Sequence, residues 1–439
     1  MSVDQFITGL DLGSYYIKAS AITGRNGDII FSAYGESQGI EDGVVTDSVR
    51  LLAAIRSVLR KLEIKTGVPV QKAFLSIDTA YTRQESSRGS AGLSKGSVSE
   101  KDMLNAIKSS MRIARTTEEQ ICDVLIDDYK VDGIVYANPI SVEGSLIDVS
   151  SQTILADKSL IGGQTRVLEN ERIQVLGTGL SVHGMANLLL TRSQRYNGAL
   201  LIDSGHRKTD VVVLKNNRIV YSETIPLGGR NITKDLSIVL KISMNEAETL
   251  KKEFGAGELS PSHPKYDLIS QVVEARAEEI LDLANKAFKN YGQWSEIEQA
   301  LVYGGGLCGF RTIASFKEDV FGISTNYMTS DIIKSDDIFS LNATGVAHNM
   351  IHELQSVLIA ELWEQPKEAE EEVEIGGNYF SVLDKVRQKA SKSMKEIIQL
   401  DEDDEDDRRG QSRKSHDDFR QKASENSIKS KLKKIFGIE

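Results

Sequence analysis

Two aspartates stand in matching surroundings and could together hold a metal-bound polyphosphate. Asp11 and Asp203 each close an apolar run, and each precedes a glycine by two positions, at Gly13 and Gly205. Each glycine opens a tight turn, and the unpaired N–H groups of such turns carry the partial positive charge that phosphate oxygens need. If the turns face each other, both carboxylates could hold Mg²⁺ through water. An aspartate at a strand end is often only a turn-former, but the matched contexts favour the metal interpretation.

A third segment, rich in glycine, adds to this pattern. The apolar run 300–303 leads into Gly304, Gly305 and Gly306, where a backbone without side chains can approach a ligand closely. A lone run of glycines can also be a flexible loop. The order of the three segments along the chain makes a ligand site the stronger interpretation.

Cations and other polar residues flank these segments. Lys18 could reach a phosphate from the second strand, or it could be an ordinary solvated lysine. Glu248, Lys251 and Lys252 share a short polar helix that could cover a base and a ribose, or form an exposed face. The candidate nucleotide-binding residues are Asp11, Gly13, Ser14, Tyr15, Lys18, Asp203, Gly205, His206, Arg207, Lys208, Thr209, Gly228, Gly229, Glu248, Lys251, Lys252, Gly304, Gly305 and Gly306.

The elements that must position these residues occur twice. Each candidate aspartate belongs to a strand–turn–strand–turn–strand unit, which predicts two similar α/β domains that face each other across a ligand-binding cleft. A chance match between two hairpins is the alternative, and the triple-glycine segment favours the duplication. The predicted strands are 6–12, 16–23 and 29–34 in the first unit and 199–203, 209–214 and 219–224 in the second.

Length, charge and cysteine content restrict the class of protein. A chain of 439 residues with 40% apolar and 27% charged residues is expected to fold into several domains. Its net charge of -11 argues against nucleic acid as the main partner. Cys122 and Cys308 suggest neither a disulfide framework nor a thiolate metal site. Without a signal-like start or a long apolar run, we expect a protein that stays in the cytoplasm and spans no membrane.

Several segments resemble a known superfamily. GLDLGSYYIKA from Gly9, LLIDSGHRKTDVVV from Leu200 and LVYGGG from Leu301 look like the first phosphate, second phosphate and adenosine motifs of the actin superfamily. Within it, residues 35–47, PLGGRNITKDLSIVL from Pro226 and EAETLKKEFG from Glu246 are similar to the bacterial FtsA family. The resemblance covers residues 6 to about 360. It implies an α/β, actin-like two-lobed fold of duplicated ribonuclease-H-like domains, with an FtsA-type 1C insertion and a disordered C-terminal tail.

The same resemblance implies a division into subdomains. The first lobe would begin with subdomain 1A and return to it after the 1C-like insertion, and the second lobe would consist of subdomains 2A and 2B. The expected boundaries are 1–72 (1A), 73–158 (1C-like), 159–198 (1A), 199–225 (2A), 226–299 (2B), 300–362 (2A and return to 1A), 363–426 (acidic flexible linker with a possible helix at 379–400) and 427–439 (amphipathic helix).

The second phosphate turn departs from the family pattern. The family usually has Asp-x-Gly-Gly-Gly-Thr-Thr-Asp, whereas this chain places His206, Arg207 and Lys208 after Gly205. Side chains in a turn that prefers glycine torsions are expected to distort its amide cradle. Arg207 and Lys208 could instead supply charge to phosphates directly. We therefore expect nucleotide binding with weak or absent ATPase activity; Tyr15 beside Ser14 is a milder departure.

The C-terminal end has the pattern of a short membrane-binding helix behind an acidic tether. Four apolar residues fall on one helical arc and four lysines fall outside it, as suits an anionic lipid surface. Each apolar side chain contributes ~1.5 to 3 kcal/mol, but ordering each residue costs ~1 kcal/mol or more, so one copy should bind weakly and a polymer firmly. The candidate membrane-binding residues are Ile428, Lys429, Lys431, Leu432, Lys433, Lys434, Ile435 and Phe436.

Membership of the FtsA family would imply a role in cell division. Such a protein binds ATP with Mg²⁺, polymerises on the cytoplasmic face of the cell membrane at the septum, tethers the ring of the tubulin-like protein FtsZ and helps recruit other divisome proteins. A PilM-like scaffold of pilus assembly shares the two-lobed fold but does not need the C-terminal helix. A soluble sugar kinase of the same superfamily would need a substrate pocket with a catalytic base, and no tail.

Overall fold

The computed structural model describes residues 6–23, 29–112, 117–136, 138–316, 319–329 and 339–349. All of them belong to one structural unit. The predicted linker at 363–426, the possible helix at 379–400 and the candidate membrane-binding residues from Ile428 to Phe436 lie outside the described residues. No helix in the described ranges combines the length and the apolar content that crossing a bilayer requires.

The first five-stranded sheet carries the turn that follows Asp11. Three antiparallel strands, β1 (Ile7–Leu12), β2 (Tyr16–Thr23) and β3 (Ile29–Glu36), are followed on the other side of β1 by two parallel strands, β6 (Lys72–Ile77) and β11 (Gln174–Leu180). The order across the sheet is β11-β6-β1-β2-β3. Asp11 lies opposite Lys18 in the β1–β2 ladder, so the turn at 13–15 stands at the end of a hairpin.

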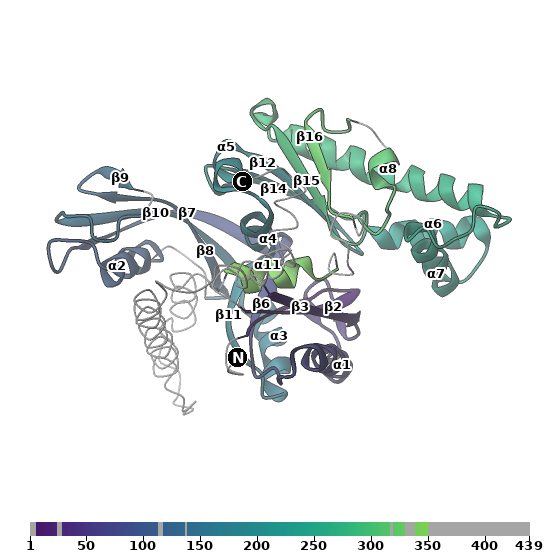
Figure 1. The fold of residues 1–439 in the computed structure, drawn as a ribbon, viewed down its shortest axis with the longest axis horizontal. Coiled ribbons are helices and arrows are strands. Elements are labelled where there is room, and N and C mark those ends of the chain that lie inside the picture. Colours follow the sequence, from purple (N-terminus) through teal and green to yellow (C-terminus); the bar gives the residue numbers. More distant parts are fainter. Residues whose placement is uncertain are drawn as a thin grey trace, which may run out of the picture. The chain divides into compact units, whose positions relative to one another are not determined.

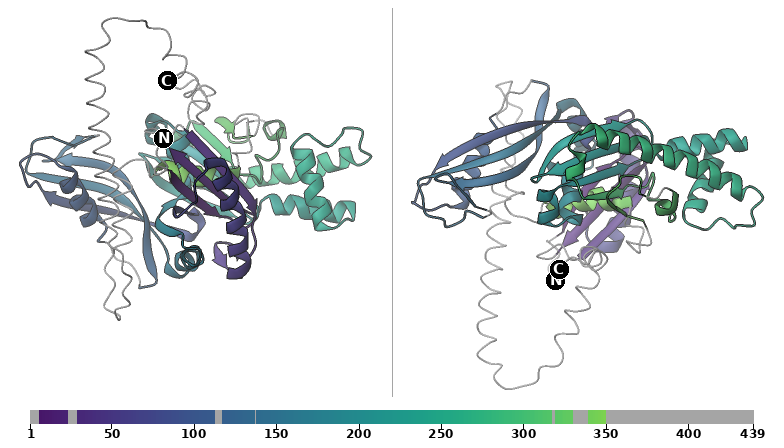
Figure 2. Two further views of the ribbon diagram at one scale, coloured as in Figure 1. Left: turned by 60° about the horizontal axis from the view of Figure 1, so that its bottom comes forward. Right: turned by 90° about the horizontal axis from the view of Figure 1, so that it is seen from above.

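Helix α1 (Ser48–Thr66) covers the β2 and β3 side of this sheet (Figure 2). It begins where the Asp47 carboxylate accepts the backbone N–H groups of Val49 and Arg50, and it ends at Gly67, whose φ of 74° is the left-handed conformation of a helix C-cap. Its buried residues recur at helical spacing: Leu51, Ile55, Val58, Leu59 and Leu62.

A four-stranded antiparallel sheet is inserted between β6 and β11 of the first sheet. Its strands are β7 (Thr82–Gly92), β8 (Glu119–Val131), β9 (Ile134–Tyr136) and β10 (Leu146–Asp157), in the order β7-β10-β8-β9. Helix α2 (Glu100–Ser110) lies on one face (Figure 1). Ser99 and Asp102 form a capping box at its start, and Met103, Ala106 and Ile107 are buried toward the sheet.

The second five-stranded sheet repeats the topology of the first. Its strands are β12 (Ala199–Ser204), β13 (Thr209–Lys215), β14 (Arg218–Ile225), β15 (Gln299–Tyr303) and β16 (Ser324–Tyr327). The order β14-β13-β12-β15-β16 again joins an antiparallel meander to two parallel strands. The predicted duplication is therefore confirmed, and all six predicted strands are present with ends that differ by no more than two residues.

Helices and short elements complete the described part of the chain. α6 (Gly229–Leu240), α7 (Met244–Gly255) and α8 (Tyr266–Asn290) pack on one another, and α8 packs on β13 and β14 (Figure 1). The remaining elements are β4 (Ile40–Glu41), β5 (Val44–Val45), η1 (Thr79–Tyr81), α3 (Lys158–Asn170), α4 (Ser181–Leu189), α5 (Arg192–Asn197), η2 (Trp294–Glu296), α9 (Ile313–Phe316) and α11 (Leu341–Asn349). The predicted subdomain boundaries stay predictions.

Helix α11 closes the first lobe although it comes last in the described chain. It packs on β1, β2 and α4, and the hydroxyls of Ser20 and Thr344 are 2.7 Å apart between β2 and α11. The contact with α4 is so close that a Cβ added at Gly184 would lie 2.6 Å from the backbone carbon of Gly345. Since α11 also carries Asn342, this packing sets the position of a side chain in the cleft described below.

Replacing Gly184 by alanine is expected to destabilise the protein by ~1 to 3 kcal/mol, because the added methyl group forces α4 and α11 apart in a packed core. Urea unfolding followed by circular dichroism measures the change. Gly162→Ala is the matched control, because a Cβ there meets nothing within 4 Å in the middle of α3. The control should be neutral or stabilising by up to ~1 kcal/mol. Equal effects of both substitutions would contradict the proposed close packing.

Candidate functional site

A cavity of about 530 Å³ is lined by residues of both five-stranded sheets. It receives the β1–β2 turn, the β12–β13 turn and the triple-glycine turn after β15, so three segments that the sequence singled out do meet. All the candidate nucleotide-binding residues line it except two, Thr209 and Gly228. The Thr209 hydroxyl is buried, 3.0 Å from the Ser204 hydroxyl, and it donates to the carbonyl of Leu227 at 2.9 Å.

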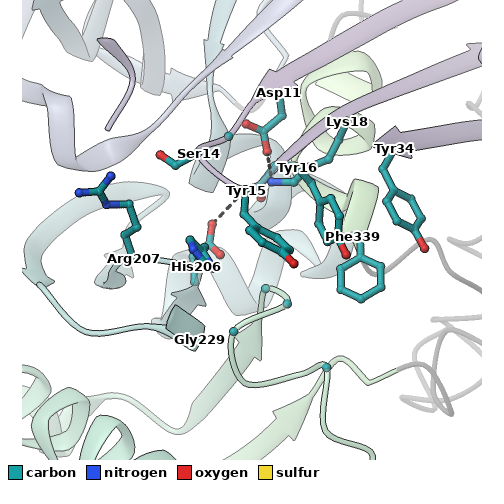
Figure 3. Close-up of a pocket in the computed structure, with 18 of the residues that line it drawn as sticks. Asp11, Ser14, Tyr15, Tyr16, Lys18, Tyr34, His206, Arg207, Gly229 and Phe339 are labelled. Atoms are coloured by element: carbon teal, nitrogen blue, oxygen red, sulfur yellow. Dashed lines mark hydrogen bonds and ion pairs between the residues drawn. The ribbon is translucent and has the colours of Figure 1, made fainter. Parts of the chain in front are cut away.

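Asp11 and Asp203 both line this cavity, as the sequence predicted, but they have different partners. Lys18 Nζ donates to Asp11 Oδ2 at 2.7 Å within the same hairpin (Figure 3). Burial alone would lower the pKa of Lys18, but the carboxylates of Asp11, Asp203 and Asp78 raise it. The lysine therefore stays charged, and it is already paired with a carboxylate rather than free for a phosphate.

Asp203 has a neutral partner instead of a cation. The side-chain amide of Asn342 donates to Asp203 Oδ2 at 3.0 Å. Burial raises the pKa of Asp203 to about 6, and the negative charges of Asp78 and Asp11 add to this effect, while the Asn342 bond and Lys18 oppose it. A buried carboxylate with this environment is stabilised by any cation that enters the cavity.

Two further aspartates, Asp78 and Asp210, line the cavity and were missed as site residues by the sequence analysis. Lys208 Nζ lies between them, 2.7 Å from Asp78 Oδ1 and 3.3 Å from Asp210 Oδ2. Burial raises the pKa of Asp210 to about 8, and repulsion from Asp78 contributes. Asp210 was visible as the last residue of the second phosphate motif; Asp78 follows β6 and had no motif to mark it.

The four aspartates do not form a direct metal cage. Within the described ranges, no three His, Cys, Asp or Glu side chains gather closely enough to hold a metal ion between them. Binding of Mg²⁺ by Asp11 and Asp203 through water stays a prediction, in which water would extend the reach of both carboxylates.

The second phosphate turn carries its side chains without the left-handed strain that the sequence led us to expect. None of the described residues from Ser204 to Thr209 has a positive φ, so no residue there needs glycine torsions. The turn is closed by a bond from the N–H of Gly205 to the carbonyl of Lys208 at 2.9 Å. His206, Arg207 and Lys208 therefore occupy this backbone without left-handed strain.

Glycines around this turn serve the packing of backbone against backbone. The carbonyls of Ser204 and Gly205 accept the N–H groups of Gly306 at 2.7 Å and Gly229 at 3.0 Å. A Cβ at Gly306 would lie 2.2 Å from the Gly205 oxygen, and one at Gly228 would lie 2.6 Å from the same atom. The N–H groups of Gly229 and Gly306 are thus used within the fold, which limits the role predicted for them in ligand binding.

At the other end of the cavity, α7 presents a buried ion pair rather than an exposed face. Lys251 Nζ donates to Glu248 Oε2 at 2.6 Å, to Thr233 Oγ1 at 2.9 Å and to the carbonyl of Gly229 at 3.1 Å. Burial lowers the pKa of Lys251, while Glu248 opposes that shift. The alternative of a solvated face is therefore excluded for Lys251.

Aromatic rings line the cavity beside these charges, and the sequence analysis did not predict them except Tyr15. The rings of Tyr16, Tyr34 and Phe339 lie 5.1 to 5.4 Å apart, centroid to centroid (Figure 3). Lys252 Nζ lies 5.1 Å from the centre of the Tyr15 ring and 5.5 Å from that of Tyr16. These aromatic faces are suited to contact a flat base or sugar. Phe339 comes far later in the chain, with no motif around it.

Comparisons by sequence find similarity to one family of cell-division proteins. A family model described as "Cell division protein FtsA" matches residues 200–403. A protein of that name from Bacillus subtilis (strain 168) is 25% identical over 349 residues, which cover 73% of this chain and 78% of the relative. The protein of that name from Streptococcus pneumoniae serotype 2 (strain D39 / NCTC 7466) is 23% identical over 344 residues, covering 74% and 75%.

Among solved structures, the PilM-PilN type IV pilus biogenesis complex aligns with a TM-score of 0.53 and 14% identity, covering 82% of this chain and 99% of that one. At this identity the likeness shows the fold alone. It confirms the predicted α/β, actin-like fold. It does not favour a PilM-like function over a function in cell division, because the relatives found by sequence are cell-division proteins.

Replacing Asp210 by asparagine is expected to weaken the pH dependence of stability. Burial raises the pKa of Asp210 to about 8, whereas an unfolded aspartate titrates near ~3.9. A carboxyl group with a raised pKa contributes its full stability below the unfolded value, and this contribution is lost as the pH rises through the folded value. The variant has no carboxyl group to titrate at this position. Its free energy of unfolding should therefore fall less between about pH 5 and about pH 8 than that of the unmodified chain, and the difference should be a few kcal/mol at most.

Urea unfolding at the two pH values measures this difference. Asp267→Asn is the control, because Asp267 is exposed at the start of α8 and outside the cavity. The control should keep the pH dependence of the unmodified chain. The same pH dependence in all three proteins would show that Asp210 does not bear an unfavourable buried charge.

Proposed function

We propose that this chain, which is similar to the FtsA cell-division proteins and has an actin-like fold, binds ATP with Mg²⁺, polymerises and tethers the FtsZ ring to the membrane. The proposed place of action is the cytoplasmic face of the cell membrane at the division septum, where the protein would help to recruit other divisome proteins. The observation that carries the nucleotide part is that Asp11, Asp203 and the triple-glycine turn line one cavity between duplicated sheets.

The residues of the cavity fit a magnesium polyphosphate. Asp203 accepts a hydrogen bond from the neutral amide of Asn342, and burial raises its pKa. Asp11 and Asp203 would hold Mg²⁺ through water, and the ion would neutralise charge on the phosphates. Glu248, Lys252 and the aromatic rings beside them would contact the base and the ribose. The cavity volume of about 530 Å³ lies in the range of small-ligand sites.

We propose that hydrolysis is weak or absent. The charged side chains at Arg207 and Lys208 are paired with carboxylates of the opposite lobe, so they would meet phosphates only after these pairs separate. In the same proposal the subdomains follow the family scheme, with 1A, 1C, 2A and 2B at the boundaries expected from the sequence, and the four-stranded sheet would belong to 1C.

Attachment to lipid is assigned to the C-terminal helix at 427–439. Its four apolar residues and four lysines would hold one copy only weakly, because ordering the helix offsets most of the ~1.5 to 3 kcal/mol that each apolar side chain contributes. Lysines near anionic lipid add at most ~1 kcal/mol each. A homopolymer that presents many helices would bind firmly through avidity. FtsZ, other divisome proteins, anionic lipid and further copies of this chain are the proposed partners.

Asp203→Ala is expected to abolish measurable binding of Mg²⁺-ATP, a loss of at least about 100-fold in affinity, because the metal loses one of its two carboxylates. Isothermal titration calorimetry on the full chain measures it. Asp267→Ala, a change of the same kind on an exposed helix outside the cavity, is the control and should bind as the unmodified chain does. Unchanged affinity of the Asp203 variant would remove this residue from the site.

Deleting residues 427–439 is expected to release the protein from anionic vesicles and, with it, any FtsZ that the protein carries. Co-flotation of FtsZ with phosphatidylglycerol vesicles, with and without this protein and ATP, measures both effects. Leu432→Glu with Phe436→Glu keeps the chain length and should act like the deletion, since it destroys the apolar arc. Flotation of FtsZ with the deleted chain at the level of the full chain would contradict the anchor.

A further inference from the structure

We propose that His206, Arg207 and Lys208 form a clasp that holds the two lobes together without nucleotide and that sets the affinity for a polyphosphate. The three residues are consecutive in the β12–β13 turn of the second lobe, and each contacts a different segment of the first lobe. The part of the inference that concerns affinity rests on the proposed nucleotide site; the part that concerns the lobes does not.

His206 contacts the first phosphate turn. Its imidazole ring stacks on the ring of Tyr15, with 4.3 Å between the centroids and 21° between the planes. Burial lowers the pKa of His206 to about 4, and Lys251 adds to this shift, so the ring is neutral near pH 7. Figure 3 shows Ser14 and Tyr15 facing His206 and Arg207 across the opening between the two turns. This ring pair therefore joins the two turns between which a phosphate chain would lie.

Arg207 contacts the short hairpin formed by β4 and β5. Its Nη1 donates to Glu41 Oε2 at 2.8 Å, and its Nε lies 3.4 Å from Asp42 Oδ1. The backbone N–H of Asp42 in turn donates to the hydroxyl of Ser14 at 3.0 Å, which ties this hairpin to the first phosphate turn. These carboxylates are about half exposed or more, so this pair alone is expected to be weak.

Lys208 makes the most protected contact of the three. Its side chain is 19% exposed, its Nζ donates to Asp78 Oδ1 at 2.7 Å, and it lies 4.3 Å from the centre of the Tyr81 ring. Burial would lower the pKa of Lys208, but Asp78 and Asp210 raise it, so the ammonium group stays charged. Asp78 follows β6 of the first lobe, whereas Asp210 belongs to β13 of the second, so one cation joins both lobes.

The turn is fixed to its own lobe, which lets its side chains hold the other. The carbonyls of Gly205 and His206 accept the N–H groups of Gly229 and Arg230 at 3.0 and 2.7 Å at the start of α6. A rigid turn presents all three side chains at once, so each contact that forms raises the effective concentration of the next two. The pattern Gly-Gly-Thr, which the resemblance places at these positions, could make none of the three contacts.

The clasp and a polyphosphate compete for the same cations. Arg207 and Lys208 are the charged groups of this turn, and they are already paired with the carboxylates of Glu41, Asp42 and Asp78. A polyphosphate that is to pair with Arg207 or Lys208 has to displace these carboxylates first. The lobes should therefore rest in a closed arrangement, and the apparent affinity for nucleotide should be lowered by the cost of opening the clasp.

The test compares the full chain with a variant that restores the glycine-rich pattern, His206→Gly, Arg207→Gly and Lys208→Thr. Spin labels at Arg60→Cys on α1 and Lys234→Cys on α6 report the distance between lobes by pulsed electron paramagnetic resonance. Both positions are exposed, and Cys122 and Cys308 are buried and do not compete for label. Without nucleotide, the parent chain should give one narrow distance and the variant a longer or broader distribution. Identical distributions would overturn the clasp.

A second variant removes the clasp contacts by substitutions in the first lobe. Glu41→Gln with Asp78→Asn removes the carboxylates that hold Arg207 and Lys208 and leaves the turn intact, and it should lengthen or broaden the distance in the same way. Arg230→Ala is the control, since Arg230 is an exposed cation next to the turn that lies outside the cavity; its distribution should equal that of the parent. If both clasp variants keep the parental distance, the lobes are held by other contacts and the inference is wrong.

Calorimetry with Mg²⁺-AMPPNP tests the effect on affinity. The glycine-rich variant should bind roughly tenfold or more tightly than the parent, since no clasp has to open first. Equal or weaker binding by a folded variant would overturn this part. Absence of binding by every protein would instead refute the proposed nucleotide site, while the distances measured without nucleotide would still decide whether the clasp exists.

Discussion

Four aspartates face the cleft from two sheets, and the cost of keeping their charges out of water governs this site. Asp11 has a full cation in Lys18, and Asp78 has one in Lys208. Asp210 shares Lys208 at a longer distance, and the partner of Asp203 within the described ranges is the amide of Asn342. Burial raises the pKa values of Asp203 and Asp210, and the negative charge of Asp78 adds to both shifts. Binding of a ligand that carries a cation is thus favoured, because the cation would offset the repulsion between these carboxylates.

The backbone around the cleft is equally constrained, although by distance rather than by charge. Gly304, with a φ of 90°, and Gly306 let the turn after β15 lie directly on the carbonyls of the β12–β13 turn. Helices α4 and α11 meet through Gly184 and Gly345 for the same reason. These contacts place Asp203 and Asn342 on a rigid frame. A glycine in such a motif is therefore explained first by the close packing of backbone segments, and it need not contact a ligand.

The sequence predicted the parts of this architecture that repeat or alternate. Two meanders with the same spacing after Asp11 and Asp203 predicted the duplicated sheets, because the alternation of apolar residues and the glycine turns are local signals. Phe339 and Asn342 could not be found in this way, since they enter the site through the return of α11 to the first lobe. Asp78 was missed because it follows an ordinary strand, and nothing local shows that Lys208 lies across from it. Contacts between lobes are properties of the tertiary fold.

Whether the backbone at His206, Arg207 and Lys208 is strained could also be decided only from the folded structure. The expectation treated the glycine pattern of the family as a requirement of the backbone, but the turn has no positive φ in its described residues. Side chains are therefore tolerated there, and what they change is the connection between lobes. If the lobes are held by the protein's own charges, the surfaces that subunits offer one another keep one arrangement until nucleotide opens the clasp. Under the proposed function, attachment through many weak helices would depend on the number of linked copies, so a nucleotide that opens the clasp and changes how copies associate would also change attachment.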